Sequence, residues 1–383
     1  MRATRAIIHL DNLKKNIRAI KSLCEEKTKL CIPVKADAYG HGAVPCAKAA
    51  IEAGADVLAV ATVDEGIELR QNGITLPLLL FSLCSKEEMD ALVSFHIMPF
   101  VCDSEYIQLV ADAARNAGER NFPVHLAVDT GMGRIGCMPE EAAVYAKEIV
   151  QTSVLSLGGV CTHFAVSDGI SKNERLFTQV QFSRFTDAIE SIKREGIDPG
   201  ICHCANSATT LESPEMHLDM VRPGIIVYGY YAGEVSQSYL ASKGIAISLE
   251  PVMTLETEVS AVRSMKRGAS IGYGRTWTAE NDTEIAVLPV GYGDGVLRSW
   301  STGAVSVAIH GTAYPIRGRI CMDQCMIELG KQSGIKRGDK AVFFGCASDG
   351  ALQTAEEIAS RTDTISYEIT TCLSKRVPRF YIS

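Results

Sequence analysis

The sequence predicts an α/β protein in which a (β/α)8 TIM-like barrel precedes a mainly antiparallel β domain. Short apolar runs alternate with helical patterns up to about residue 245, and alternating strands broken by glycines follow. A chain of 383 residues is also too long for one ordinary core. We therefore expect two domains, residues 1–245 and 246–383, with the first strand, 5–10, packed either in the barrel or on the second domain.

Eight strand-like apolar runs favour the barrel. Helical patterns separate them, and Thr62 with Glu65 forms a capping box for the helix after the second run. No Gly-x-Gly-x-x-Gly turn opens the first unit, although composition alone also permits an open doubly wound sheet. The expected barrel strands are 30–34, 57–61, 78–81, 98–101, 124–128, 157–161, 201–204 and 220–227. The expected strands of the second domain include 253–259, 284–290, 304–309 and 340–344.

Composition excludes several classes of protein. The formal charge of −7 gives no basic excess for binding nucleic acid or an anionic membrane. No apolar run approaches the roughly 20 residues that span a bilayer. The thirteen cysteines form no zinc-like pattern and lie mostly in apolar runs, so we expect reduced thiols, no bound metal and a cytoplasmic protein.

Polar side chains able to do chemistry lie at or just after the ends of the expected barrel strands. Barrel enzymes carry their active sites at this edge of the sheet. One such residue is no more than a solvated loop side chain, but several from separate strands indicate a site. They are Lys35, Arg134, His163, Asn206, Ser207 and Arg222.

Lys35 ends a buried strand, where burial lowers the pKa of an amine from its usual value of about 10.4. Such an amine can attack an aldehyde cofactor, and pyridoxal phosphate is the cofactor that then acidifies a substrate Cα–H. Asn206 and Ser207 follow the seventh strand, and Arg222 to Ile225 follow the eighth, where barrels often bind phosphate. The positions of these residues after the last two strands indicate a binding site for a phosphorylated ligand.

Nine short segments carry a more specific signal. They read VKADAYGHG at 34–42, DTGMGR at 129–134, THF at 162–164, ANS at 205–207, VRPG at 221–224, IGYG at 271–274, GYGDGVLR at 291–298, GRICMDQ at 318–324 and RVPR at 376–379. In these segments, in their order and across the whole chain, the sequence resembles the alanine racemase family.

The resemblance implies an isomerase that interconverts L-alanine and D-alanine with pyridoxal 5'-phosphate and supplies D-alanine for cell-wall peptidoglycan. Lys35 would carry the cofactor as a Schiff base and act as the acid or base on the D-alanine face. Tyr273 would act on the L-alanine face from the other subunit of a homodimer with shared active sites. Racemisation needs two such groups because the proton leaves one face and returns to the other.

The resemblance also assigns binding roles. Arg222 would face the pyridine nitrogen with His163 behind it, and its permanent charge would keep that nitrogen unprotonated. Arg134 would lie near the cofactor phenolate and the substrate carboxylate, and Met322 and Tyr292 would contact the substrate from the second domain. The phosphate would be held by Tyr39, Ser207, Gly224, Ile225 and Tyr367.

One position departs from the pattern of the family. Many relatives have a carbamylated lysine seven residues before the arginine equivalent to Arg134, and this chain has Ala127 there. Alanine cannot be carbamylated. We expect Arg134 to be supported instead by an anion such as chloride, by another side chain or by water, because an isolated buried charge is expensive.

Three other functions fit parts of the pattern. A racemase of the same fold could prefer serine or accept many amino acids, but the bulk of Tyr367 favours alanine. A non-catalytic pyridoxal-phosphate carrier would not need the second domain or Tyr273. Decarboxylases of similar architecture match the glycine-flanked tyrosine turns less well.

Overall fold

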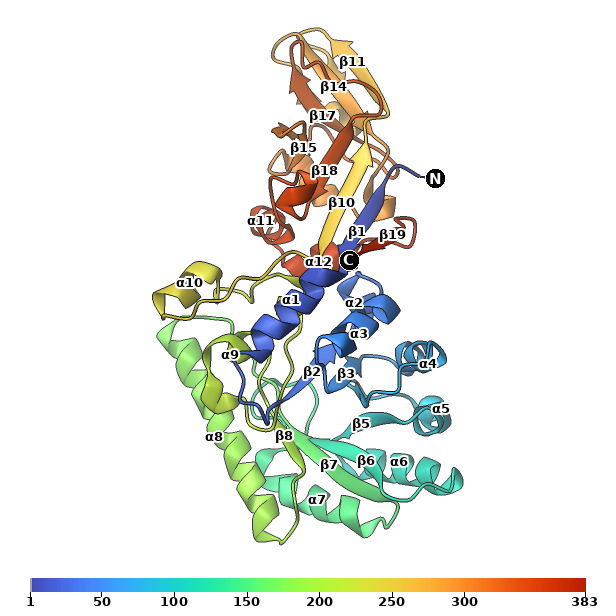
Figure 1. Cartoon of the computed structure of the whole chain (residues 1–383), viewed down its shortest axis with the longest axis vertical. Coiled ribbons are helices and arrows are strands. Elements are labelled where there is room, and N and C mark those ends of the chain that lie inside the picture. The colour runs from blue at the N-terminus through green and yellow to red at the C-terminus, as the bar shows by residue number, and fades with distance from the viewer. Residues whose placement is uncertain (1) are drawn as a thin grey trace.

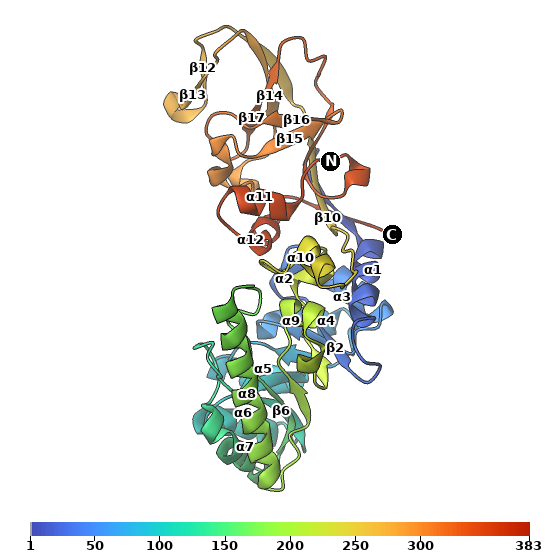
Figure 2. The same cartoon turned by 90° about the vertical axis from the view of Figure 1, so that its left-hand side faces the viewer.

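The protein has two lobes, a barrel and a β domain (Figure 1, Figure 2). The structure, a computed structural model, describes residues 2–383 apart from the side chain of Thr302. Helix α1 (Leu10–Lys21) lies between the lobes and follows strand β1 (Arg5–His9) without a loop. The fold predicted from the sequence, a TIM-like barrel with a mainly antiparallel β domain, is confirmed.

The barrel is a parallel sheet in the order β8-β7-β6-β5-β4-β3-β2-β9. Two backbone hydrogen bonds close it between β8 and β9: Asp219 donates to the Cys202 carbonyl at 3.1 Å, and Arg222 donates to the Ala205 carbonyl at 2.9 Å. The carboxyl ends of the strands therefore meet at one mouth. The strands are β2 (Lys29–Pro33), β3 (Val57–Val60), β4 (Leu78–Leu80), β5 (Ile97–Val101), β6 (Phe122–Ala127), β7 (Leu155–Cys161), β8 (Ile201–His203) and β9 (Met220–Val221).

The last barrel strand is much shorter than expected. The prediction of a strand over 220–227 was wrong, because β9 ends at Val221 and the 3-10 helix η4 (Ile225–Tyr228) follows. Pro223 has no N–H group with which to continue a ladder, and Gly224 turns the chain with φ −96° and ψ −97°. The backbone after β9 consequently bends over the mouth of the barrel.

Helices surround the barrel. They bury apolar stripes at helical spacing, as in α1, where Leu13, Ile17 and Ile20 are fully buried. The barrel-side helices are α2 (Lys35–Tyr39), α3 (Ala43–Glu52), α4 (Val63–Gln71), α5 (Met89–Ser94), α6 (Ser104–Asn116), α7 (Ala142–Gln151), α8 (Lys172–Arg194), α9 (Ser207–Glu212) and α10 (Gln237–Ser242). The predicted capping box is present, since Thr62 and Glu65 cap α4 reciprocally.

The β domain contains a six-stranded sheet, a three-stranded sheet and a two-stranded ribbon, in the orders β16-β15-β18-β10-β1-β19, β11-β14-β17 and β12-β13. The first strand belongs here: β1 pairs with β10 in antiparallel and β19 in parallel register. The strands are β10 (Met253–Glu258), β11 (Ala261–Met265), β12 (Ser270–Ile271), β13 (Trp277–Thr278), β14 (Thr283–Leu288), β15 (Ser306–Ile309), β16 (Thr312–Pro315), β17 (Cys325–Gly330), β18 (Lys340–Phe344) and β19 (Arg379–Ile382), and the helices are α11 (Ala355–Arg361) and α12 (Ser366–Thr371).

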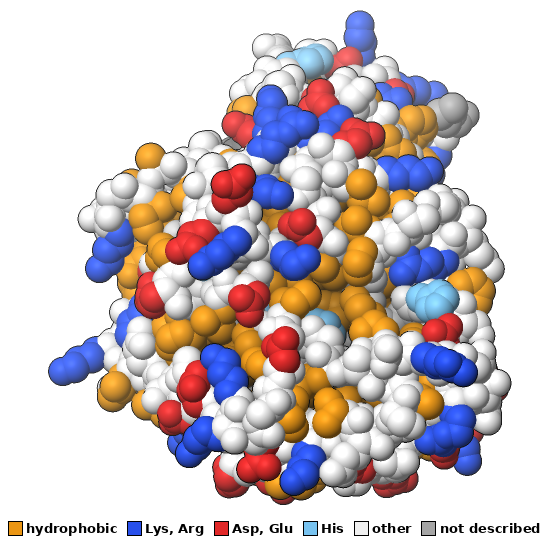
Figure 3. Space-filling view, turned by 60° about the horizontal axis from the view of Figure 1, so that its bottom comes forward, with side chains coloured by type: hydrophobic (Ala, Val, Ile, Leu, Met, Phe, Trp, Pro, Cys, Tyr) orange, Lys and Arg blue, Asp and Glu red, His pale blue; other side chains and the backbone are white. Residues whose placement is uncertain are grey.

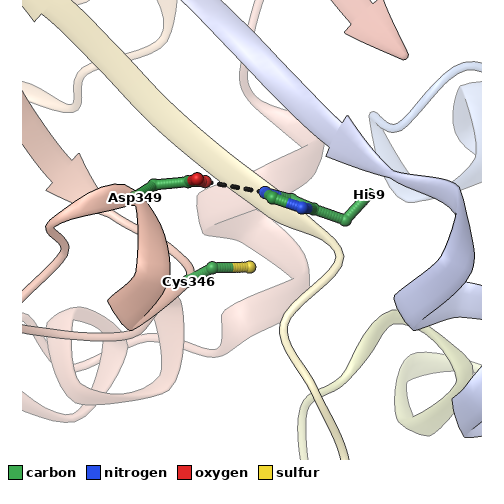
Figure 4. Close-up of side chains that lie close together, drawn as sticks. All are labelled: His9, Cys346 and Asp349. Carbon is green, nitrogen blue, oxygen red and sulfur yellow. Dashed lines mark hydrogen bonds and ion pairs between the residues drawn. The ribbon is translucent and has the colours of Figure 1, made fainter. Parts of the chain in front are cut away.

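A small polar cluster joins the end of β1 to the loop after β18 (Figure 4). His9 Nε2 and Asp349 Oδ2 form a hydrogen bond of 2.7 Å, and Cys346 lies beside them. Potential metal-ligand atoms of the three residues lie within 4.8 Å of one another. The Cys346 thiol donates to the Pro251 carbonyl at 3.0 Å. These hydrogen bonds join segments that are distant in sequence, and they account for why the three side chains lie together.

On the face seen in Figure 3, positive and negative side chains are interspersed rather than gathered by sign. Among the described residues, no helix is both long and apolar enough to cross a membrane. All thirteen cysteines have free thiols.

Candidate active site

A cavity of about 390 Å³ opens at the mouth of the barrel. It collects most of the site residues predicted from the sequence. Ile225 is fully buried and, within the described part of the chain, is not among the lining residues. The predicted residues that line the cavity are Lys35, Tyr39, Arg134, His163, Asn206, Ser207, Arg222, Gly224 and Tyr367.

Lys35 lies two residues after the end of β2, and a left-handed turn follows it. The next four residues, Ala36 to Tyr39, all have φ between 52° and 55°. A left-handed conformation costs an L-residue about 1–2 kcal/mol, so four in succession need strong support from their surroundings. The turn places the amine of Lys35 and the ring of Tyr39 in the same cavity.

Hydrogen bonds hold this turn at both ends. The Ala36 N–H donates to Glu65 Oε1 at 2.6 Å, and the Ala43 N–H donates to Asp37 Oδ1 at 2.7 Å. Beyond the turn, Arg379 Nε donates to the Gly40 carbonyl at 3.0 Å. The turn is therefore fixed by α4 on one side and by the C-terminal segment on the other.

The surroundings of Lys35 favour the neutral amine. Burial lowers the pKa of Lys35, the nearby positive charge of Arg134 lowers it further, and the carboxylate of Glu65 opposes them. The amine lies 5.9 Å from the centre of the Phe81 ring. A neutral amine is the form that attacks a carbonyl carbon or removes a proton.

Arg222 is a buried cation held by neutral groups. One of its terminal nitrogens donates to the Thr162 carbonyl at 2.7 Å, and the other donates to the His203 carbonyl at 2.9 Å. Among the described residues, its hydrogen-bond partners include no carboxylate. Its full positive charge is therefore available to a group in the cavity, since no anion neutralises it.

The histidine behind Arg222 is mainly His203, which was not predicted from the sequence. His203 Nδ1 lies 2.6 Å from the guanidinium, whereas His163 Nδ1, the expected partner, lies at 3.4 Å. Arg222 can only donate, so His203 Nδ1 accepts and its Nε2–H donates to His125 Nδ1 at 2.8 Å. The position of His203 at the end of β8 was the available signal.

These histidines are neutral. Burial, with the charge of Arg222 adding to it, lowers the pKa of His125 and of His163 to about 3. The pKa of His203 is well below its usual value for the same reasons. Arg222 is therefore a permanent cation surrounded by imidazoles that carry no charge at neutral pH, and of these His163 lines the cavity.

A group of donors converges beside the bend after β9. A Cβ atom at Gly224 would lie 2.8 Å from the Tyr39 hydroxyl and 3.7 Å from Ser207 Oγ, so only glycine leaves this space open. The Gly224 N–H donates to Ser207 Oγ at 2.9 Å. Burial raises the pKa of Tyr39, so its hydroxyl keeps the proton that it can donate. These groups form a cradle for an anion.

Two further residues complete this cradle. Asn206 caps α9, and its side chain also bonds Ser167 Oγ at 2.8 Å, so it positions the neighbouring Ser207. Tyr367 comes from α12 of the β domain, and its ring centre lies 5.7 Å from that of Tyr39. Burial raises the pKa of Tyr367 to about 12, so its hydroxyl is protonated as well. The cavity is therefore built by both domains.

Three predicted site residues of the β domain, Tyr273, Tyr292 and Met322, lie apart from the residues described so far. Their exposed fractions are 68%, 43% and 53%, and none of them lines the cavity of its own chain as far as the described residues show. Backbone bonds join two of their turns, since the Gly293 N–H donates to the Met322 carbonyl at 2.9 Å. They form an exposed group on the β domain.

Arg134 is exposed in the single chain. No hydrogen bond or ion pair is found for it among the described residues, and Ala127 is buried in the same cavity wall. We expected an anion, another side chain or water to support Arg134. Within the described part of its own subunit, no side chain does so.

A barrel with a half-buried lysine at its mouth, an anion cradle and a second β domain defines a two-domain barrel enzyme. The family model for the alanine racemase N-terminal domain matches residues 8–232, and that for the C-terminal domain matches residues 252–381. The chain belongs to the alanine racemase family, whose named activity is that of an isomerase.

Relatives with that name align over the whole chain. The alanine racemase of Treponema denticola is 47% identical, covering 100% of this chain and 99% of its own. That of Treponema pallidum is 40% identical and fully covered on both sides. Among solved structures, the Clostridium difficile 630 alanine racemase has a TM-score of 0.91 at 38% identity, covering 100% of this chain and 96% of its own. These matches support alanine racemase function.

Replacing Gly40 by alanine should destabilise the protein strongly. Gly40 has φ +85°, and an added Cβ would lie 2.2 Å from the Thr370 carbonyl oxygen. We expect Gly40→Ala to lower the free energy of unfolding by about 3 kcal/mol, measured by urea denaturation. Gly73→Ala is the matched control, because Gly73 has φ +83° and open space around it. Equal losses in the two variants would contradict the predicted clash.

Proposed function

We propose that the protein is a pyridoxal-phosphate-dependent racemase that interconverts L-alanine and D-alanine by a two-base mechanism. The observation that carries the proposal is one cavity holding the low-pKa amine of Lys35, the charge of Arg222 and the donor cradle around Gly224. The family membership supports alanine as the substrate.

The residues of the cavity fit pyridoxal 5'-phosphate. Space that a Cβ would fill at Gly224, between the hydroxyls of Tyr39 and Ser207, suits a phosphate. Tyr367 would add a third hydroxyl, and Ile225 a backbone donor. Lys35 would hold the cofactor covalently, and Arg222 would face the ring nitrogen. When bound, the cofactor supplies the electron sink that acidifies the substrate Cα–H.

Lys35 and Tyr273 would share the proton transfers. Lys35 Nζ would remove or return the proton on the D-alanine face of Cα. The hydroxyl of Tyr273 from the partner subunit would do so on the opposite face, which agrees with its exposure in the single chain. Arg222 would donate to the ring nitrogen and keep it unprotonated, which limits charge delocalisation and so disfavours side reactions.

The substrate would be held at its carboxylate and limited at its side chain. Arg134 and the partner subunit's Met322 would bind the carboxylate, with Tyr292 of the partner subunit beside them. Tyr367, which lines the cavity, would restrict the space next to the methyl group and so favour alanine over serine. We place the homodimer in the cytoplasm, where D-alanine would supply cell-wall peptidoglycan.

Exchange of the substrate Cα proton tests the two-base assignment. Lys35→Ala should lose the visible absorption of the lysine-linked cofactor and all exchange with deuterated water. Tyr273→Phe should keep that absorption and still exchange D-alanine, but racemise about 10²- to 10⁴-fold more slowly. NMR of alanine in deuterated water measures both. A wild-type protein with neither exchange nor racemisation would instead be a carrier of the cofactor.

Mixing two inactive variants tests the shared active site. In a hybrid dimer of Lys35→Ala and Tyr273→Phe, one site combines both changes and the other is intact. Random reassociation after mild dissociation should therefore restore about a quarter of wild-type activity. Mixtures that stay inactive while hybrid dimers are detected by native mass spectrometry would show that Lys35 and Tyr273 act from the same chain.

Replacing Ala127 by lysine tests what supports Arg134. We propose that an anion such as chloride occupies the space beside Ala127, because an unpaired guanidinium is costly once a subunit covers it. In wild type, chloride in place of gluconate at equal ionic strength should lower the KM for alanine about threefold. Ala127→Lys with bicarbonate should lose this dependence. A wild-type KM that is identical in both salts would eliminate the anion.

A further inference from the structure

Glu65 makes more hydrogen bonds than its capping role requires. Its Oε2 accepts from the Thr62 N–H at 3.3 Å and from the Ala61 N–H at 2.8 Å. Its Oε1 accepts from the Ala36 N–H at 2.6 Å, between the segments that follow the neighbouring strands β2 and β3. The first contact completes the capping box of α4. Capping does not explain the bond to Ala36, which joins α4 to the turn after β2.

The Ala36 N–H belongs to the peptide group that joins Lys35 to the left-handed turn. Fixing the plane of this peptide fixes the direction in which the side chain of Lys35 leaves the backbone. The backbone before Lys35 is fixed independently, since the Val34 N–H donates to the Ala59 carbonyl at 2.8 Å. Glu65 therefore supplies the constraint on the other side of Lys35.

The hydrogen bond from the Ala36 N–H to Glu65 Oε1 belongs to a strong class of hydrogen bond. A carboxylate accepting from a backbone N–H is charge-assisted, and such bonds are stronger than those between neutral groups; this one measures 2.6 Å. Water could also reach Ala36, which is exposed, but water would not hold the peptide plane in one orientation. The left-handed conformation is unfavourable by itself and would relax most readily at this end.

We propose that Glu65 is a positioning residue for Lys35, acting through the N–H of Ala36. It holds the amine where it can carry the cofactor and reach the substrate Cα. Its carboxylate also acts on the amine directly, alongside Arg134 and the neutral His163, which face Lys35 from the loops after β6 and β7. This inference rests on the proposed function for the role of Lys35 in proton transfer.

Three substitutions separate the position of the carboxylate from its charge. Glu65→Gln removes the charge, and Glu65→Asp keeps the charge but is one methylene too short to reach Ala36 while capping α4. Asp64→Asn is the matched control, because Asp64 is the exposed neighbouring acid in the same first turn of α4. Circular dichroism and thermal unfolding establish that each variant is folded.

The first readout uses the cofactor-free chain and no racemase activity. Competitive acetylation by acetic anhydride, read by peptide mass spectrometry at Lys35, gives the pKa of its amine. Removing a nearby negative charge disfavours the ammonium, so Glu65→Gln should lower this pKa by about 0.5 unit or more. Glu65→Asp and Asp64→Asn should leave it near the wild-type value. An unchanged pKa in Glu65→Gln would show that the carboxylate does not act on Lys35.

The second readout is the deuterium isotope effect on racemisation. A misplaced Lys35 slows proton removal from D-alanine, so Glu65→Asp and Glu65→Gln should lower kcat about tenfold or more. The isotope effect should rise with Cα-deuterated D-alanine but not with Cα-deuterated L-alanine. Asp64→Asn should match wild type in both. Wild-type kinetics in Glu65→Asp, or equal losses in Asp64→Asn, would overturn the positioning role.

The two readouts distinguish failure of this inference from failure of the proposed function. If the wild-type holoenzyme shows no exchange that depends on Lys35, the two-base assignment is wrong. The acetylation result would still report whether Glu65 acts on the Lys35 amine. If the wild type racemises by Lys35 and Tyr273 but the Glu65 variants do not differ from Asp64→Asn, only the positioning role falls.

Discussion

The left-handed turn after Lys35 is the constraint on which the site depends. Four consecutive L-residues hold a conformation that each would avoid, at a combined cost of about 4–8 kcal/mol. A right-handed turn would point Tyr39 and Lys35 along a different path and separate the amine from the anion cradle. Glu65 and Asp37 each take part in a hydrogen bond to the turn, and Arg379 bonds Gly40 just beyond it. Because Arg379 belongs to β19, the β domain helps to set the geometry of the barrel's active site.

Local sequence patterns predicted the elements well but not the bends between them. Seven barrel strands lie within three residues of the expected bounds, because buried apolar runs leave few alternatives. The eighth was overestimated: the run 220–227 is apolar, yet Pro223 ends its ladder. The left-handed turn also escaped prediction, since in its AlaAspAlaTyr sequence no glycine marks positive φ. Its conformation is imposed by residues distant in the chain.

Residues of the candidate cavity were predicted where they carry recognisable chemistry and were missed where they contact other side chains behind it. Lys35, Arg222 and Ser207 come at strand ends within distinctive segments. His125 lies inside β6, where a histidine looks like an ordinary core residue. His203 ends β8, but only the fold shows that both histidines line up behind Arg222. The support of Arg134 could not be predicted, because the sequence shows only that Ala127 lacks the expected amine and not what fills its place.

The burial of Arg222 among neutral groups explains how the proposed chemistry could stay selective. A carboxylate at this position would favour a protonated ring nitrogen, whereas a guanidinium can only donate to it. The charge of Arg222 and burial keep His203 and His125 neutral, so neither can supply a competing proton to that nitrogen at neutral pH. Proton transfer is then left to groups beside the substrate Cα. Among the described residues of the single chain, the proposal assigns this role to Lys35 alone, which is why the exposed Tyr273 and the shared dimer site belong to one proposal.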